Sequence, residues 1–179
     1  SRGVVHRDVK PDNILVGPGT NGGVGIVKLC DLGLAREAGV DASVTASGCT
    51  LGTPRYMSPE QARGEKDVDA RSDIYSLGVT LFHALTGNPP FPEESGIVVM
   101  SRHLYDDVPD VRASRPGLSP RIAEVVAKMT KRKREERVSD VSSLVRTLGR
   151  TFRAVRHVGR VGAVRALGPL TPGSPAYDV

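Results

Sequence analysis

An eight-residue polar stretch, H-R-D-V-K-P-D-N at positions 6–13, constrains this chain more than any other feature. It places the carboxylate of Asp8, the ammonium of Lys10 and the carboxamide of Asn13 close together in the sequence. Pro11 has no N–H and disfavours the helical region for the residue before it, so no helix runs through the stretch. The aliphatic run that follows predicts a strand. The sequence therefore predicts a polar loop held in front of a strand.

A second acidic position follows this loop. Asp31-Leu32-Gly33 follows another strand-like run, residues 26–29, after one intervening residue. Carboxylate and amide oxygens suit magnesium, so Asn13 and Asp31 are candidate metal ligands. Phosphoryl transfer needs a base near the attacking hydroxyl, cations on the phosphate oxygens and ligands for magnesium. The aspartate and the lysine of the loop could supply the first two, whereas a chance collection of turn residues is the alternative explanation.

Four motifs together resemble the eukaryotic-type protein kinase family, and in particular its bacterial serine/threonine kinase group. They are H-R-D-V-K-P-D-N (6–13), D-L-G (31–33), G-T-P-R-Y-M-S-P-E (52–60) and D-I-Y-S-L-G (73–78). The resemblance extends from the first residue to about Leu148. It implies a mainly α fold (α+β overall), the C-terminal, helix-rich lobe of a protein-kinase-like fold. A short β-hairpin would carry the catalytic and magnesium loops, and the small lobe is absent.

The resemblance also implies the residues of the active site. The catalytic residues would be Asp8, Lys10, Asn13 and Thr53. The nucleotide would be bound by Lys10, Asn13, Leu15 and Asp31, and magnesium by Asn13 and Asp31, so ATP and Mg²⁺ are the expected cofactors. A threonine at position 53 together with a lysine at position 10 resembles the serine/threonine branch of the family and argues against a tyrosine kinase.

Regulatory and structural roles follow from the same resemblance. Residues 34–51 match an activation segment, whose candidate phosphorylation sites are Thr45, Ser47 and Thr50. Arg7 would bind a phosphate on this segment, because a guanidinium binds phosphate bidentately. The expected structural residues are His6 and Leu32, which would stack, Glu60 and Arg137, which would pair, and Asp73, which would hold the backbone of residues 6–7.

Apolar periodicity predicts the helices that surround this site. A buried helix should span 73–86, capped by Asp73 and ended by Gly87. A second helix should span 97–105, and a third should begin at Ser119-Pro120. Ser139 should cap a last helix, with the inward-facing residues Val141, Leu144, Val145 and Leu148. We expect a partial kinase domain over 1–150 and a basic, then Gly/Pro-rich, disordered tail over 151–179.

Charge and composition bound the other possibilities. The net charge is +5, and residues 121–165 hold 13 Lys/Arg against 4 Asp/Glu. Such an end can bind nucleic acid or an anionic membrane surface, but a solvated helix face is the commoner explanation. The two cysteines, the lack of a long apolar run and the lack of an opening signal peptide favour a cytoplasmic location, or the cytoplasmic face of a membrane.

These observations favour an ATP-dependent serine/threonine protein kinase, which signals by phosphorylating protein substrates. A catalytically silent kinase-like scaffold is the alternative. Against it stand four intact residues that a scaffold does not need: Asp8, Lys10, Asn13 and Asp31. Nucleic acid is not an expected partner, because the basic end lacks the interleaved aromatic residues that stack on bases. The sequence opens inside a loop and without Met, so we expect a fragment that is inactive without its small lobe. Membrane association of the parent protein stays open, as do the substrate, the activating signal and the oligomeric state.

Overall fold

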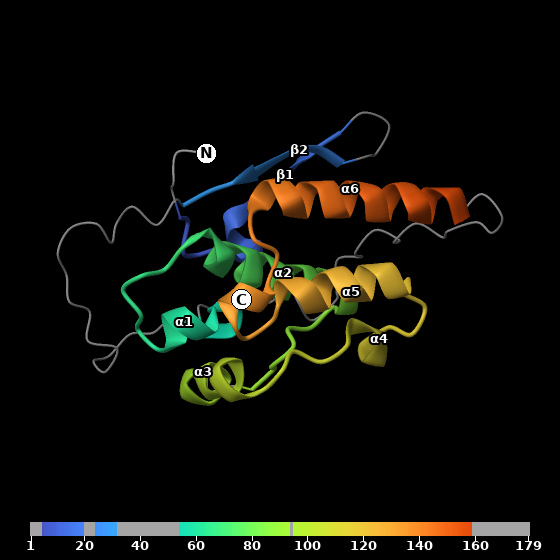
Figure 1. Ribbon diagram of the computed structural model, residues 1–179. Coiled ribbons are helices and arrows are strands. Elements are labelled where there is room, and N and C mark those ends of the chain that lie inside the picture. Colours follow the sequence, from blue (N-terminus) through green and yellow to red (C-terminus); the bar gives the residue numbers. More distant parts are fainter. Residues whose placement is uncertain (1–4, 20–23, 32–53, 94, 159–179) are drawn as a thin grey trace.

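The computed structural model describes residues 5–19, 24–31, 54–93 and 95–158 of the 179-residue chain. Figure 1 shows a two-stranded hairpin at one side of a group of helices. In chain order the elements are η1 (Pro11–Asn13), β1 (Ile14–Pro18), β2 (Val24–Leu29), η4 (Pro54–Tyr56), α1 (Pro59–Ala62), α2 (Ala70–Thr86), α3 (Gly96–Tyr105), α4 (Val111–Ser114), α5 (Pro120–Met129), η5 (Arg134–Glu136) and α6 (Val141–Val158), where η marks a 3₁₀ turn.

The hairpin confirms both strands that the sequence predicts. β1 and β2 are antiparallel, with Ile14 opposite Leu29 and Val16 opposite Val27, and the register shifts between Val16 and Pro18. Because Ile14 pairs with Leu29, the residue before β1 and the residue after β2 meet at the same end of the hairpin. This pairing brings the H-R-D-V-K-P-D-N loop to Asp31, the first residue of the D-L-G motif.

Helix α2 begins earlier than the sequence predicts. It starts at Ala70, and Asp69 caps it by accepting a hydrogen bond from the backbone N–H of Arg71. The expectation that Asp73 caps this helix is therefore wrong, because its carboxylate instead bonds to the loop before η1. Gly87 ends the helix with φ +83°, a left-handed conformation that glycine adopts without strain.

Helix α2 is the centre of the core. Its Ile74 packs with Val125, Met129 and Leu144 from α5 and α6, and other α2 residues enter two further clusters of buried side chains, one with α4 and α5 and one around Tyr56. At Gly78 an added Cβ would lie 2.8 Å from Met129 Cβ. Helices α2 and α5 are therefore too close at this point for any residue with a side chain. The burial of α2 on most sides is confirmed.

The last helix differs from its predicted form in three ways. Asp140, not Ser139, caps it, because the Asp140 carboxylate accepts from the backbone N–H of Ser143. Leu144 is buried, but Val141 and Val145 are 53% and 62% exposed, so the inward face is narrower than expected. The helix also continues to Val158, across the boundary expected at residue 150, and the expected disorder beyond it concerns residues 159–179, which lie outside the described part.

The described residues are thus mostly helical with one two-stranded antiparallel hairpin. The predicted helices at 97–105 and after Ser119 are present as α3 and α5. Within the described residues no helix has both the length and the apolar character needed to cross a membrane.

Candidate active site

The end of the hairpin joins the two polar motifs. The backbone N–H of Cys30 donates to the carbonyl of Asn13 over 2.8 Å, which extends the strand pairing by one step. The turn η1 closes the loop on the other side, since the N–H of Asn13 donates to the carbonyl of Lys10. Asn13 and Asp31, the two candidate metal ligands, therefore stand at adjacent strand ends.

Asp8 lies at the centre of a small set of polar contacts. Its Oδ2 is 3.1 Å from Lys10 Nζ and accepts from Asn13 Nδ2 at 3.1 Å. Asn13 Nδ2 also donates to the backbone carbonyl of Asp8 at 2.8 Å. Within the described residues Asp8 Oδ1 has no hydrogen-bond partner, so one carboxylate oxygen is fixed and the other is open to a further group. The structure thus brings together Asp8, Lys10 and Asn13.

The imidazole of His6 ties this loop to the second motif. It is buried, and its Nε2 lies 2.9 Å from the carbonyl of Cys30, which can only accept. Nε2 therefore carries the proton, and Nδ1 can accept the backbone N–H of Asp8 at 3.3 Å. One neutral tautomer serves both contacts. The predicted stacking of His6 on Leu32 concerns a residue outside the described part of the chain.

Two residues of the site hold an unusual backbone conformation. Arg7 has φ +67° and Asp31 has φ +51°, in the left-handed region that costs a non-glycine residue about 1 kcal/mol or more. The carboxylate of Asp73 accepts from the N–H groups of His6 and Arg7, each at 2.8 Å. Gln61 Nε2 donates to the Arg7 carbonyl at 2.8 Å. These bonds hold the strained turn that precedes Asp8, and they confirm the contact predicted for Asp73.

Replacing Asp73 by alanine is therefore expected to loosen the catalytic loop. The part-buried N–H of His6 and the exposed N–H of Arg7 lose a charged acceptor, so we expect a loss of about 2 kcal/mol in unfolding free energy. Burial raises the pKa of the Asp73 carboxyl above its ordinary value, and the two N–H donors oppose this shift without cancelling it. Hydrogen exchange of the Arg7 and Asp8 amides in the full-length protein measures the effect. Asp69→Ala removes the cap of the same helix and its ion pair with Arg71 but no contact with the catalytic loop, so it is the control and should leave those amides protected.

Glu60 and Arg137 form a fully buried ion pair, as predicted. Arg137 Nη1 lies 2.6 Å from Glu60 Oε1 and Nη2 lies 2.8 Å from Oε2. The remaining N–H groups of Arg137 reach the carbonyls of residues 71, 131 and 132, so all five of its donors are used. Burial alone would raise the pKa of Glu60, but hydrogen bonds from Arg137 and Ser72 outweigh it and hold that pKa below its ordinary value. The pair fixes α1 against the segment that directly follows η5.

A fully buried histidine, His103, is linked to this pair through Tyr75, whose ring lies under the Arg137 guanidinium. His103 of α3 contacts the Tyr75 hydroxyl at 2.8 Å and the Arg55 carbonyl at 3.1 Å. Burial lowers the pKa of His103 to about 4. Sequence analysis did not single out His103, and only its place on the inward face of the predicted helix could have pointed to it. The same holds for Gln61, whose contact with Arg7 crosses 54 positions of sequence.

The lowered pKa of His103 predicts an acid-sensitive fold. The unfolded chain binds a proton at this residue near pH 6.5 and the folded chain only near pH 4, so the unfolded state binds more protons in between. Stability should therefore be unaffected by this group above pH 6.5 and fall by about 3 kcal/mol as the pH drops to 4. The measurement is the pH dependence of the unfolding free energy of the full-length protein compared with that of His103→Gln. Parallel curves would contradict the prediction, because the other histidines are common to both proteins.

The donor set fits magnesium bound together with a nucleotide. Asn13 uses its amide N–H groups on Asp8, which leaves its carbonyl oxygen for a cation, and Asp31 adds an exposed carboxylate. The described residues contain no group of three or more His, Cys, Asp or Glu side chains placed to hold a metal. Magnesium commonly takes one or two protein ligands and completes its shell with phosphate and water. The side-chain oxygens of Asn13 and Asp31, at adjacent strand ends, would supply these one or two protein ligands.

Several predicted residues lie outside the described part of the chain. These are Thr53, Leu32 and the candidate phosphorylation sites Thr45, Ser47 and Thr50. Leu15 is on β1 and 57% exposed, and its role toward a nucleotide base stays a prediction. Arg7 is exposed beside Asp8, and its role toward a phosphate also stays a prediction.

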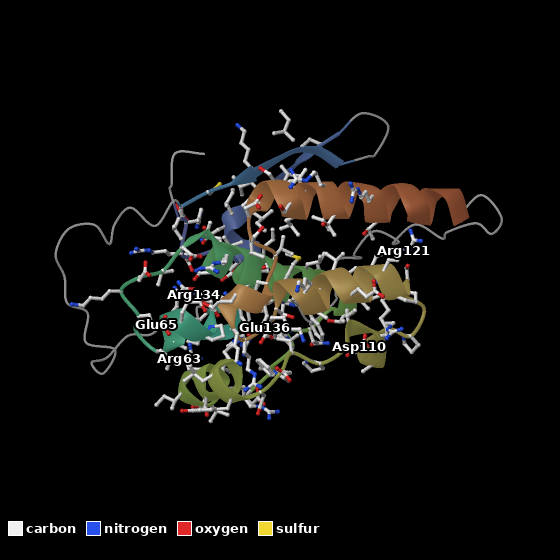
Figure 2. All side chains as sticks on the ribbon, in the orientation of Figure 1. Arg63, Glu65, Asp110, Arg121, Arg134 and Glu136 are labelled. Carbon is white, nitrogen blue, oxygen red and sulfur yellow. The ribbon has the colours of Figure 1, made fainter. Side chains whose placement is uncertain are left out.

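The basic run 131–134 is largely neutralised by neighbouring acids. Arg132 lies 2.9 Å from Asp107, and Lys133 and Arg134 each lie 3.8 Å from Glu136 and Asp67 respectively. Figure 2 shows labelled charged side chains of both signs at both ends of the molecule. Such exposed pairs add little stability, but they offset the local positive potential. The structure therefore supports a solvated charged surface at this run.

Comparison with known proteins agrees with the motifs. Residues 1–148 match the family described as Protein kinase domain. The serine/threonine-protein kinase PknL of Mycobacterium tuberculosis is 42% identical over 142 residues, which cover 79% of this chain and 34% of the relative. PknB of the same organism is 43% identical over 143 residues, and the DNA damage-responsive serine/threonine-protein kinase RqkA of Deinococcus radiodurans is 38% identical over 144 residues. The aligned part makes up only 22% and 21% of these two relatives.

Proposed function

This chain belongs to the protein kinase domain family, and we propose that the full-length protein transfers the γ-phosphoryl group of ATP to serine or threonine side chains of protein substrates. The bacterial relatives that it matches are named serine/threonine kinases. The chain spans about a third or less of their length, so the activity of the whole protein is part of the proposal.

The contacts of Asp8 carry this proposal. Lys10 and Asn13 hold Oδ2, which leaves Oδ1 to accept the proton of an acceptor hydroxyl. The ammonium of Lys10, held beside Asp8 through Oδ2, is close enough to the proposed base to bind the transferring phosphate as well. Asn13 and Asp31 would hold magnesium, which neutralises charge on the phosphate oxygens when it is bound. A scaffold without phosphotransfer would have no use for this arrangement.

The test is an assay of the full-length protein with magnesium, γ-labelled ATP and a generic basic protein substrate. We expect label on phosphoserine and phosphothreonine after acid hydrolysis of the product. Label on phosphotyrosine alone would contradict the proposed residue class. Incorporation no higher than in an Asp8→Asn variant would favour the scaffold alternative. The same assay on residues 1–179 alone tests the expectation that this part transfers no phosphoryl group by itself.

A further inference from the structure

His103 joins three elements that are far apart in the sequence. It lies on α3, and its ring is fully buried between Tyr75 of α2, Arg55 of η4 and Phe91. The Phe91 ring meets it edge-on, with the ring centroids 4.9 Å apart. Both ring nitrogens have polar partners, at 2.8 Å and 3.1 Å, although His103 itself is closed to water.

The direction of each hydrogen bond follows from the chemistry of the partners. The carbonyl of Arg55 can only accept, so Nε2 of His103 carries the proton and donates to it. Nδ1 then has a lone pair, and the hydroxyl of Tyr75 donates to that nitrogen. The neutral ring therefore bridges a hydroxyl that donates and a carbonyl that accepts. A purely apolar side chain at this position would leave both partners buried and unpaired.

The bridge holds η4, the turn at positions 54–56. Helix α3 contacts this turn at a second point, because an added Cβ on Gly96 would lie 3.2 Å from Pro54 Cγ. On the α2 side the Tyr56 hydroxyl lies 2.7 Å from His83 Nδ1. The turn is therefore held between α2 and α3 by polar contacts at two successive residues.

The same bridge is linked to the catalytic loop. The Arg137 guanidinium lies over the ring of Tyr75, 4.8 Å from its centroid, and pairs with Glu60 at the start of α1. From α1, Gln61 reaches the carbonyl of Arg7 beside the proposed base. Hence η4 and the loop that carries Asp8 are fixed to one buried polar frame, of which His103 is the member on α3.

We propose that His103 is a positioning residue: it fixes η4 beside the acceptor site and thereby sets how tightly the protein substrate binds, without acting on ATP. This inference rests on the proposed function. The turn directly follows position 53, which the family resemblance counts among the catalytic residues together with Asp8 and Lys10. A displaced turn would therefore misplace the surface that the acceptor segment meets. The residues proposed to contact the nucleotide, Lys10, Asn13 and Asp31, are positioned by η1 and by the end of the hairpin. The frame reaches the catalytic loop at the Arg7 carbonyl and not at these three residues, so their positions should change little.

The experiment uses the full-length protein and four variants. His103→Leu removes both hydrogen bonds, Tyr75→Phe removes one, and His103→Gln keeps an N–H donor that can reach the Arg55 carbonyl. Leu144→Ala is the matched control, because it destabilises the core between α2, α5 and α6 without touching η4. For each protein we would measure KM for a basic protein substrate, KM for ATP, and hydrogen exchange of the backbone amides at 55–62.

We expect His103→Leu to raise the KM for the protein substrate by about tenfold while the KM for ATP stays within about twofold. Exchange of the amides at 55–62 should become faster in the same variant. His103→Gln should show smaller changes in both measurements, and Tyr75→Phe should lie between the unaltered protein and His103→Leu. The control should change neither the substrate KM nor the exchange at 55–62.

Three results would overturn the inference. Unchanged exchange in His103→Leu would show that the bridge does not hold the turn. Faster exchange with an unchanged substrate KM would show that the turn does not govern substrate binding. An equal rise in both KM values would show a general effect on the fold. Absence of phosphotransfer in the unaltered protein would overturn the proposed function instead, and the exchange measurement would still decide whether His103 holds η4.

Discussion

Replacing Asp8 by asparagine in the full-length protein is expected to lower phosphotransfer by about a thousandfold and to leave nucleotide binding nearly unchanged. The substitution keeps the shape of the side chain but removes the oxygen that can take up a proton. Asn13 and Asp31, the expected magnesium ligands, are not altered. The measurements are kcat with a protein substrate and the dissociation constant for ATP in the presence of magnesium.

Asp12→Asn supplies the control for this experiment. Asp12 lies four positions further along the same loop and is exposed, so its replacement changes the charge of the loop by the same amount without touching the proposed base. We expect phosphotransfer within about threefold of the unaltered protein. Unchanged turnover in Asp8→Asn would refute the assignment of Asp8 as the base. Equal losses in both variants would point to the charge of the loop as the cause.

The geometry around Asp8 could be predicted from the sequence because its parts are local. Asp8, Lys10 and Asn13 are separated by two and three positions, and the proline between them prevents a helix. Two aliphatic runs then predict the hairpin that brings Asp31 to the same end. The long-range contacts of Asp73 and Glu60 came from the family resemblance, since nothing in their local sequence identifies a partner 60 or more positions away.

Other features depended on tertiary packing and could not be predicted. Both Ser139 and Asp140 can cap a helix, and the choice of Asp140 depends on which backbone N–H its carboxylate reaches. Val141 and Val145 have the spacing of a buried face, but the packing of α6 against α2 and α5 buries Leu144 and leaves these two valines exposed. The bridge at His103 depends on three elements meeting, which no single segment of the sequence encodes.

The buried pair of Glu60 and Arg137 leads to the largest expected change in stability. Replacing Arg137 by methionine leaves the Glu60 carboxylate buried, with only Ser72 still bonded to it from another element. It also frees the carbonyls of residues 71, 131 and 132. Breaking a buried ion pair from one side typically costs about 4 kcal/mol. We expect a loss of this size in the unfolding free energy, measured by hydrogen exchange of the α2 amides in the full-length protein.

The double variant Glu60→Gln with Arg137→Met separates the pair from the charge that it leaves behind. With no ion left in the core it should be more stable than Arg137→Met alone, because the penalty of an unpaired buried charge exceeds the loss of the attraction. Arg112→Met, which breaks an exposed pair with Asp110, should change stability little. The lowered pKa of Glu60 adds a check by pH: its contribution should be present above the ordinary glutamate pKa and be lost as the pH falls through the lowered value. Equal stability of Arg137→Met and the double variant would contradict this account, because it would mean that Glu60 carries no charge in folded Arg137→Met.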